Sequence, residues 1–248
     1  MNKTVLITGG TTGIGKQTAI VLGQRGWNIA FTSRNIERGL QFEKELKEMN
    51  IKATFYQLDV TDEEAVKNVI DAVIKDYGKM DCIVNNAGIA GENKLFADCS
   101  TENLRSMIDT NVMGVYYGMK YAIRHYLKTG GGNIVNLASI AGLNGIPYAA
   151  QYGATKHAVV GLTKGVAIEY ADKNIRVNAV APGACDTEIL QAARDAGNYD
   201  DSSLKSMHPM QRMGKPIEIA KTIAFLASDE VPFMTGAIIS ADGGYNAK

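Results

Sequence analysis

Residues 4–15 read TVLITGGTTGIG, a short apolar run that ends directly in a glycine-rich turn. The turn opens a helix with apolar periodicity that continues to Leu22. Such a turn needs glycine where the backbone approaches a pyrophosphate, which the free N–H groups of the helix N-terminus then bind. The spacing Gly9-x3-Gly13-x-Gly15 departs from the common GxGxxG pattern and points to one group of dinucleotide-binding folds. The predicted phosphate-binding residues are Gly9, Thr11, Thr12, Gly13, Ile14 and Gly15.

Short β-branched apolar runs alternate with amphipathic stretches along most of the chain, a pattern typical of a parallel sheet covered by helices on both faces. The clearest helix is predicted at 62–77, where apolar residues recur behind an acidic first turn that suits the helix dipole. We find no repeat, low-complexity tract or linker. The sequence therefore predicts one domain, 1–248, with a doubly wound Rossmann fold and a seven-stranded parallel sheet. The predicted strands are 3–8, 27–32, 52–58, 80–85, 132–137, 174–180 and 237–241.

The composition argues against several classes of protein. The 248 residues include 26 basic and 26 acidic side chains, so the chain has no global attraction for nucleic acid or an anionic membrane surface. Its three cysteines have no CxxC spacing and its three histidines no metal-ligand spacing, so we expect neither a disulfide framework nor a metal site. The N-terminal apolar run is too short for a signal peptide, and no run reaches the ~20 residues of a membrane helix. We expect a cytoplasmic protein that acts on a small molecule.

The end of the second predicted strand bears on the choice of dinucleotide. An acidic side chain there would bind the ribose 2′-hydroxyl and repel a 2′-phosphate. This chain has Thr32-Ser33-Arg34, and the Arg34 guanidinium can form charge-assisted bonds to a 2′-phosphate. The alternative is a solvated arginine that opens the next helix. We predict contacts from Ser33 and Arg34 and a preference for NADP(H), with NAD(H) as the second choice.

Reactive side chains are concentrated in the middle of the chain. Ser139 follows the end of a predicted strand, and Tyr152 and Lys156 share one face of a helix because they are four residues apart. A tyrosine with its usual pKa near ~10 is a poor base at neutral pH, but an adjacent ammonium and a nicotinamide cation would favour the phenolate. A packed tyrosine beside a solvated lysine is the structural alternative, which the YxxxK spacing alone does not exclude.

Taken together, these motifs resemble the classical short-chain dehydrogenases/reductases over nearly the whole chain. The motifs that carry the resemblance are Thr8-Gly9-x3-Gly13-x-Gly15, Asp59-Val60, Asn85-Asn86-Ala87-Gly88, Asn111, Ser139, Tyr152-x3-Lys156, and Pro182-Gly183 with Thr187. The resemblance implies a catalytic tetrad in which Tyr152 is the acid/base and Lys156 lowers its pKa and holds the ribose hydroxyls. Within the same tetrad, Ser139 would orient the carbonyl, and Asn111 would anchor a proton-relay water.

The resemblance also implies contacts to the adenosine half of the cofactor. Asp59 would bond the adenine amino group, with Val60 as a backbone contact, although Asp59 is equally suited to a turn. Asn86, Ala87 and Gly88 would let the chain pass close to the adenine ribose, although this tripeptide is also ordinary turn chemistry.

Further contacts are implied on the nicotinamide side. Thr187, which follows Pro182 and Gly183, would hold the carboxamide, although a threonine before Glu188 is more commonly a helix N-cap. Ser139 has its own alternative, as a small residue at a crowded strand end. Thr12 stands where NADP-preferring relatives often carry a basic residue, which counts against the cofactor prediction.

The regular alternation fails over residues 184–214, which are rich in Asp, Ser and Gly. Long insertions of this kind often close over a binding site, so we predict a substrate lid here in preference to a plain surface excursion. An apolar substrate pocket is predicted from Ala141, Leu143, Ile146, Tyr148, Ile189, Met207 and Met210.

The predicted activity is NAD(P)(H)-dependent hydride transfer between nicotinamide and a carbonyl or secondary alcohol. Apolar walls favour a 3-oxoacyl thioester, a hydroxysteroid or another hydrophobic ketone, and a sugar or polyol dehydrogenase is the alternative. A non-catalytic NAD(P)-binding sensor would be expected to lack Tyr152 or Lys156, and related epimerases carry a further substrate domain. The resemblance also implies a homotetramer that pairs the helices near 101–128 and 150–171.

Overall fold

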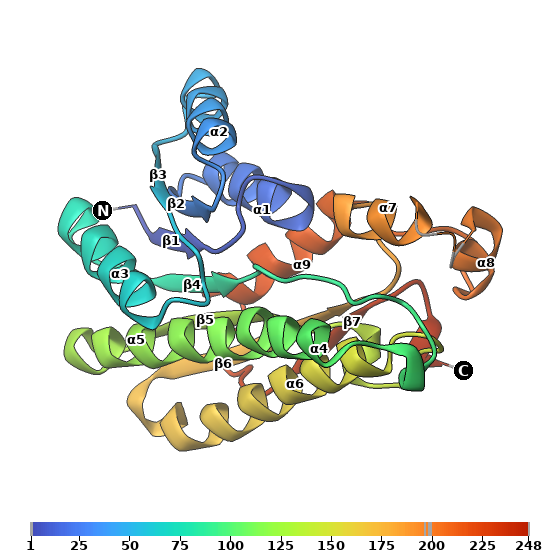
Figure 1. The fold of residues 1–248 in the computed structure, drawn as a ribbon. Coiled ribbons are helices and arrows are strands. Elements are labelled where there is room, and N and C mark those ends of the chain that lie inside the picture. Colours follow the sequence, from blue (N-terminus) through green and yellow to red (C-terminus); the bar gives the residue numbers. More distant parts are fainter. Residues whose placement is uncertain (1, 196, 198–199, 248) are drawn as a thin grey trace.

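A seven-stranded parallel sheet runs through the centre of the computed structural model, which describes residues 2–195, 197 and 200–247 (Figure 1). The strands are β1 (Thr4–Ile7), β2 (Asn28–Ser33), β3 (Ala53–Gln57), β4 (Cys82–Asn85), β5 (Gly132–Leu137), β6 (Ile175–Pro182) and β7 (Ile238–Ala241). Their order in the sheet is β3-β2-β1-β4-β5-β6-β7. The predicted Rossmann fold with seven parallel strands is confirmed.

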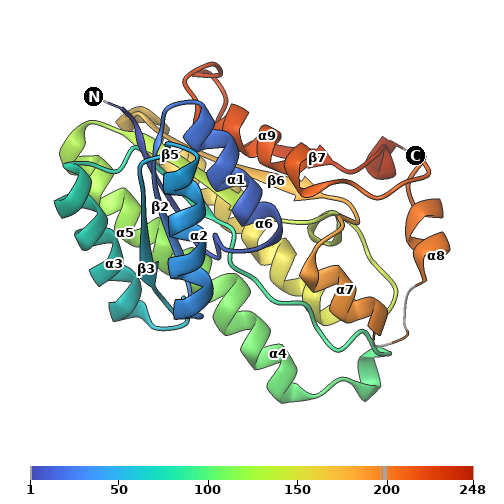
Figure 2. The same ribbon diagram turned by 90° about the horizontal axis from the view of Figure 1, so that it is seen from above.

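Helices cover both faces of the sheet (Figure 2). They are α1 (Gly13–Gln24), α2 (Ile36–Glu48), α3 (Glu63–Tyr77), α4 (Thr101–Met107), α5 (Gly114–Thr129), α6 (Ala150–Tyr170), α7 (Glu188–Asp195), α8 (Asp201–Ser206) and α9 (Pro216–Ala227). Among the described residues, no helix combines the length and the apolar character needed to cross a membrane.

Each face of the sheet forms its own hydrophobic core. Side chains alternate along a strand, so Val5 and Ile7 of β1 pack with α1, α2 and α9, whereas Leu6 packs with α3, α5 and α6. Both layers are filled by aliphatic side chains, among which Leu22 and Val159 are fully buried. Burial on both faces explains why the strands read as continuous apolar runs.

The strand order reverses between β1 and β4. β1 pairs in parallel with β2 on one side and with β4 on the other, so the chain leaves the ends of β1 and β4 toward opposite layers. In open parallel sheets, ligands bind in the crevice at this point, outside the carboxyl ends of the strands. The strands point toward the side of the molecule on which α7 and α8 lie (Figure 1).

The element boundaries follow local chemistry. The Asp62 carboxylate accepts a hydrogen bond from the Ala65 N–H (3.0 Å) and thereby caps α3, which ends at Gly78 with a φ of 82°. Helix α3 therefore starts one residue after the predicted start at 62. The largest deviations among the strands are two residues: β4 starts at Cys82 instead of residue 80, and β6 continues to Pro182 beyond the predicted end at 180.

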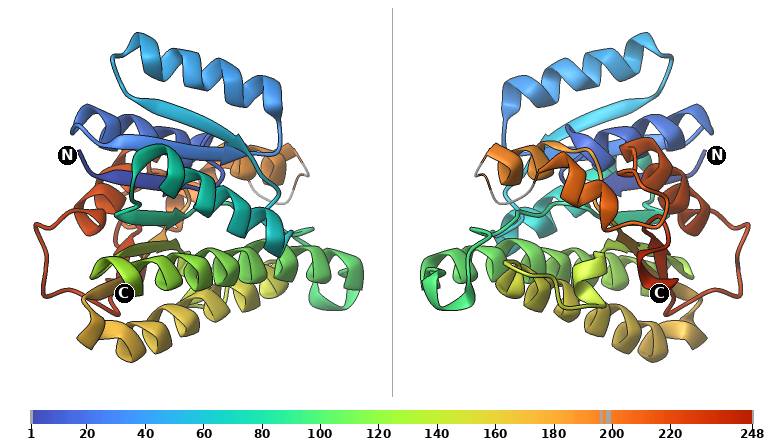
Figure 3. Two further views of the ribbon diagram at one scale, coloured as in Figure 1. Left: turned by 90° about the vertical axis from the view of Figure 1, so that its left-hand side faces the viewer. Right: turned by 90° about the vertical axis from the view of Figure 1, so that its right-hand side faces the viewer.

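The segment predicted as a lid, 184–214, departs from the sheet after β6 and returns before α9. Within its described residues it contains α7 and α8, so it is more regular than its composition suggested. Its two ends lie side by side, since Cys185 and Gly214 form an isolated parallel bridge. Both helices lie beyond the carboxyl ends of the strands in Figure 1, and the right-hand view of Figure 3 shows them, in orange, on the near side. Residues 196, 198 and 199 of the predicted lid, and residues 1 and 248 of the predicted domain, lie outside the described residues.

Candidate active site

The glycine-rich turn between β1 and α1 leaves no room for larger residues. A Cβ on Gly15 would lie 2.3 Å from the Gly9 carbonyl oxygen, and one on Gly10 would lie 2.7 Å from the Phe31 Cβ. Gly9 and Gly13 have φ values of 65° and 48°, in the left-handed region that favours glycine. The glycines of the predicted motif are therefore required by the backbone path itself.

The N-terminus of α1 is suited to an anion. Thr12 is the N-cap residue, but its side chain makes no capping hydrogen bond, and the first turn contains no acidic residue. Thr11 is buried, whereas Ile14 is partly buried against the α1 side of the core. The first N–H groups of the helix and its positive dipole end therefore remain available for a phosphate.

Asn86, immediately after β4, fastens the glycine turn to the neighbouring strand end. Its Nδ2 donates to the carbonyl oxygens of Thr8 and Gly9, both at 2.9 Å. The Thr8 hydroxyl in turn accepts hydrogen bonds from the N–H groups of Asn86 and Ala87, both at 3.0 Å. The Asn86 side chain therefore supports the turn, which is a structural role beside the cofactor contact implied by the resemblance.

Three predicted site residues converge beyond Asn86. A Cβ on Gly88 would lie 3.2 Å from the Asn111 Oδ1 and 3.7 Å from the Lys156 Nζ. Asn111 is fully buried, and its amide exchanges hydrogen bonds with the backbone of Ile89, accepting from N–H (2.8 Å) and donating to C=O (2.9 Å). It lies in a π-helical turn, η2 (Ile108–Met113), an irregularity that is frequent at functional sites.

Tyr152 and Lys156 lie on successive turns of α6, as their spacing predicted. The Lys156 ammonium is 5.6 Å from the centre of the Tyr152 ring and donates to the Leu137 carbonyl oxygen at 2.8 Å. Lys156 is 5% exposed, so it is not the solvated lysine of the structural alternative. The Ser139 side chain, which follows β5, hydrogen-bonds Tyr152 and also caps the short helix η3 (Ile140–Gly142).

The electrostatics of this group differ from the expectation in one respect. Burial raises the pKa of Tyr152 to about 12, and the hydrogen bond with Ser139 acts in the opposite direction. Burial lowers the pKa of Lys156 to about 8, because the charged ammonium is removed from water. In the chain alone, burial therefore moves the pKa of Tyr152 upward, which is opposite to the lowering by Lys156 that was predicted. A phenolate here needs an additional positive charge.

The residues predicted to meet the adenosine lie at the ends of β2 and β3. Arg34 is exposed, and within the described part of the chain it makes no hydrogen bond or ion pair, so its guanidinium is free for a ligand. The Ser33 hydroxyl accepts from the Asn35 N–H at 3.1 Å. Asp59 accepts from the Thr61 N–H (3.0 Å) and hydroxyl (2.9 Å), which supports the turn interpretation. Val60 is buried.

Thr187 lies across the cleft from the glycine turn. A Cβ on Gly13 would lie 3.2 Å from the Thr187 Cγ2, and both residues line a cavity of about 340 Å³ between α1 and α7. The Thr187 hydroxyl also accepts from the Leu190 N–H at 3.4 Å, so it caps α7 as the alternative predicted. Pro182 ends β6, and Gly183 donates its N–H to the Ala241 carbonyl oxygen at 3.1 Å.

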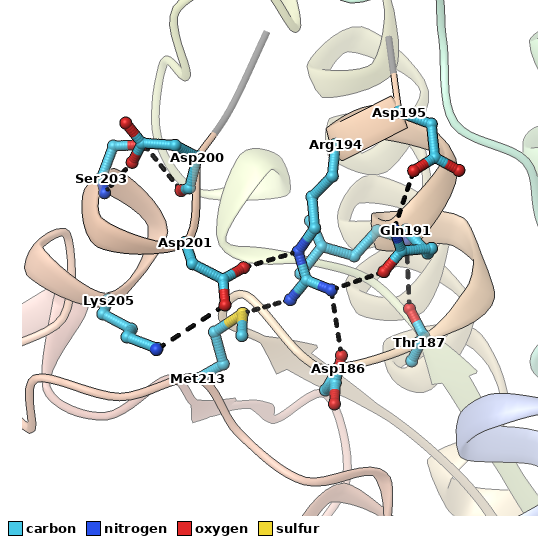
Figure 4. Close-up of polar contacts among 11 residues, drawn as sticks. Asp186, Thr187, Gln191, Arg194, Asp195, Asp200, Asp201, Ser203, Lys205 and Met213 are labelled. Carbon is cyan, nitrogen blue, oxygen red and sulfur yellow. Dashed lines mark hydrogen bonds and ion pairs between the residues drawn. The ribbon is translucent and has the colours of Figure 1, made fainter. Parts of the chain in front are cut away.

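Arg194, which the sequence analysis missed, connects the parts of the lid. Its side chain is 16% exposed, and its Nε and Nη1 pair with Asp201 (3.0 Å) and Asp186 (3.3 Å). It also donates to the Gln191 amide oxygen at 2.9 Å and contacts the Met213 sulfur at 3.0 Å (Figure 4). An arginine among scattered aspartates gives no signal in the sequence, because its partners come together only in the folded lid.

Two further residues escaped prediction. Arg38 of α2 pairs with Glu188 of α7 at 3.2 Å, across 150 positions of sequence. His208, in the returning part of the lid, is buried and bonds the backbone on both sides. Neither residue belongs to a local motif, so composition and spacing could not identify them.

Several known proteins are similar to this chain in sequence and in fold. A family described as enoyl-(acyl carrier protein) reductase matches residues 9–246. The cyclohexanol dehydrogenase of Acinetobacter sp. (strain SE19) is 39% identical over 247 residues, which are 100% of this chain and 96% of that protein. Among solved structures, ElxO with NADP bound is 47% identical with a TM-score of 0.94, and its Y152F variant with NADPH bound is 46% identical with a TM-score of 0.94. Both comparisons cover 100% of each chain.

The chain therefore belongs to the short-chain dehydrogenase/reductase family, and it is an oxidoreductase that acts on alcohols and ketones.

Proposed function

We propose that this enzyme transfers hydride between NADP(H) and a hydrophobic ketone or secondary alcohol, with Tyr152 as the acid/base. The observation that carries the proposal is the convergence of Asn111 and Lys156 beside Gly88, with the Tyr152 ring 5.6 Å from the Lys156 ammonium, next to the glycine turn at the carboxyl ends of the strands. The complete tetrad argues against a non-catalytic sensor.

The residues present fit a dinucleotide. The uncapped N-terminus of α1 suits a pyrophosphate, and the positions of Gly13 and Gly15 allow its close approach. The unpaired Arg34 suits the 2′-phosphate of NADP(H), which would distinguish it from NAD(H). ElxO, with NADP bound in its solved structure, supports the same choice of cofactor.

The proton chemistry follows from the environment of Tyr152. NADP(H), when bound, supplies or accepts the hydride at the carbonyl carbon. In reduction, the Tyr152 hydroxyl donates its proton to the substrate oxygen, and the Ser139 hydroxyl stabilises the negative charge that grows there. The raised pKa of Tyr152 keeps this proton in place at neutral pH. In oxidation, the Tyr152 hydroxyl must first lose its proton, so that its oxygen can accept the proton of the substrate alcohol. The buried Lys156 ammonium and the positive nicotinamide of the bound cofactor both favour this phenolate.

The substrate is proposed to be apolar. Ala141 is buried two residues after Ser139, and Tyr148 is exposed just before α6. Ile189 and Met210 are exposed in the lid. We propose that these side chains form the mainly apolar walls of the substrate pocket. A cyclic ketone, a hydroxysteroid or a 3-oxoacyl thioester matches these walls, and the similarity to cyclohexanol dehydrogenase favours a cyclic alcohol. A sugar or polyol would require more polar partners than these walls offer.

The proposal is tested with purified enzyme, NADPH or NADH, and a panel of cyclic ketones, acyl thioesters and polyols. We expect NADPH oxidation with at least one hydrophobic ketone, and a loss of about 10²–10⁴-fold in kcat for Tyr152→Phe with retained NADPH binding. Near-normal turnover in that variant would refute the assigned acid/base. Arg34→Ala is expected to raise the KM for NADPH about tenfold and to leave that for NADH unchanged.

The proposed assembly is a homotetramer. The outer face of α6 supports close packing of a second copy, since a Cβ on Gly161 or Gly165 would meet no atom within 4 Å and Ile168 is 83% exposed. Light scattering on the wild type and on Gly165→Arg tests this proposal. We expect the variant to lose the contact across α6 and to have a smaller molar mass in solution than the wild type.

A further inference from the structure

His208 lies in the returning part of the lid and is buried, with 1% of its surface exposed. The proposed mechanism does not use this ionisable side chain. Its Nδ1 lies 2.6 Å from the Asp242 carbonyl oxygen, and its Nε2 lies 3.1 Å from the Ala184 backbone nitrogen. A carbonyl oxygen can only accept and a backbone N–H can only donate. The two contacts are therefore both satisfied only by the neutral imidazole that carries its proton on Nδ1.

The surrounding backbone packs closely against this ring. A Cβ on Gly183 would lie 2.6 Å from the His208 Cε1, and one on Gly243 would lie 3.4 Å from the His208 Cβ. On another side the ring of Tyr245 lies 5.7 Å away, centre to centre. The imidazole thus fills the space between the segments that follow β6 and β7. We call this contact of His208 with residues 183–184 and 242–243 the joint.

The joint lies at the base of the lid, where backbone hydrogen bonds hold the two ends of the lid together. Ala184 accepts a hydrogen bond from the Gly214 N–H (2.9 Å), and Gly214 accepts one from the Asp186 N–H (3.0 Å). The returning part of the lid is itself tied to the C-terminal loop by the Met210 N–H, which donates to the Gly243 carbonyl oxygen at 3.1 Å. The His208 side chain links all three segments, since it bonds Ala184 and Asp242 from within the returning part.

We propose that His208 is a positioning residue that fixes the segment 183–187, and with it Thr187, at the nicotinamide side of the cleft. This proposal rests on the proposed function, because it assigns that side of the cleft to the nicotinamide. Thr187 follows Ala184 by three positions and faces Gly13, so a shift of Ala184 moves the wall opposite the glycine turn. Both ring nitrogens are engaged with backbone groups, so His208 does not act as a second base.

The first test determines the state of the imidazole in the wild-type enzyme. Nitrogen NMR of the histidine rings is expected to show His208 with a protonated Nδ1 and an unprotonated Nε2. Hydrogen exchange is expected to show a protected Ala184 amide. A protonated Nε2 at neutral pH, or rapid exchange of Ala184, would overturn the proposal without any variant.

The second test uses substitutions that separate hydrogen bonding from bulk. His208→Leu fills the space without either bond, whereas His208→Gln offers one donor and one acceptor on a single amide. We expect rapid hydrogen exchange of the Ala184 amide in the leucine variant, and NADPH binding about tenfold weaker than in the wild type. The glutamine variant is expected to bind NADPH with an affinity within about threefold of the wild type. Adenosine 2′,5′-bisphosphate, which lacks the nicotinamide, is expected to bind all three proteins equally.

His125 provides a matched control. Its Nε2 also accepts a backbone N–H, from Met80 at 3.3 Å, but Met80 precedes β4 and so lies at the amino ends of the strands, away from the cleft. His125→Leu should lower stability and leave NADPH binding unchanged. Equal NADPH affinity in His208→Leu and wild type, or equal weakening for the nicotinamide-free probe, would refute the positioning role. Failure of the wild type to bind NADPH would instead refute the proposed function, while the Ala184 exchange still reports on the joint.

Discussion

The glycine turn and the lid face each other across one cleft, but different forces hold them. The turn between β1 and α1 is fixed by backbone fit, since the atom nearest to an added Cβ on Gly15 is a carbonyl oxygen at 2.3 Å. The lid is held by long side chains, among which Arg194 bridges Asp186 and Asp201, two residues whose side chains are more than half exposed. Backbone fit tolerates almost no displacement, whereas ion pairs to exposed carboxylates contribute little stability, because water competes for the carboxylate oxygens.

This contrast suits the proposed reaction. A phosphate site must be preformed, because its donors are backbone N–H groups that cannot be re-aimed by side-chain rotation. A lid must let substrate enter and product leave, so elements of low local stability are suited to it. We therefore expect substitutions in the turn to affect global stability and substitutions in the lid to act locally.

The largest effect is expected for Gly15→Ala. The added methyl group overlaps the Gly9 carbonyl oxygen and the Asn86 amide nitrogen, at 2.3 and 2.5 Å, so the turn must separate from β4. We expect the free energy of unfolding to fall by about 3–4 kcal/mol in urea titrations, with loss of NADPH binding. Gly145→Ala is the control, because a Cβ there meets nothing within 4 Å and should change stability by less than about 1 kcal/mol. Similar losses in both variants would contradict the steric argument.

A second effect comes from the buried ammonium of Lys156. Its pKa is about 8 in the folded chain and near the usual value when unfolded, so the unfolded state holds more protons between these values. Stability must then rise with pH across that interval, because the penalty of the buried charge is full below pH 8 and disappears above about pH 10.5.

The measurement compares urea unfolding of the wild type and Lys156→Met from pH 7 to pH 10. We expect the difference in unfolding free energy to move in favour of the wild type by roughly 2–3 kcal/mol as the pH rises. Lys164→Met, on an exposed position of the same helix, should show the pH dependence of the wild type. A flat difference for Lys156→Met would mean that the lysine is not desolvated.

A smaller, local effect is expected for Arg194→Met in the lid. The substitution keeps much of the packing against Met213 but removes the pairs to Asp186 and Asp201. We expect the global free energy of unfolding to change by less than about 1 kcal/mol, with faster amide exchange confined to the described residues of 184–214. A global loss as large as that of Gly15→Ala would erase the distinction between turn and lid.

The smallest effect is expected at the contact between α2 and α7. Glu188→Gln removes the ion pair with Arg38, in which both side chains are more than half exposed. We expect less than about 0.5 kcal/mol in a double-mutant cycle with Arg38→Gln at low salt, and no coupling at high salt. A coupling above about 1 kcal/mol would show that this pair clamps the lid against the cofactor half.

Much of the fold was readable from local patterns. The strands buried on both faces are continuous apolar runs, and α3 carries its own start and stop signals in Asp62 and Gly78, so these elements were predicted within two residues. The catalytic group was equally accessible, because Tyr152 and Lys156 are held one turn apart by the helix itself. The helices of the lid were not predicted, since their apolar positions are few and their polar contacts cross several segments.

The sequence by itself determined the parallel sheet, the glycine turn and the spacing of the reactive pair, because each depends on residues close together in the chain. Only the tertiary structure decided which way the pKa values of Tyr152 and Lys156 move, since burial is set by every element packed around them. It also decided the roles of Asn86, Arg194 and His208, whose partners lie up to 78 positions away. Hydrogen bonds between distant segments exist only after folding, so no local pattern records them.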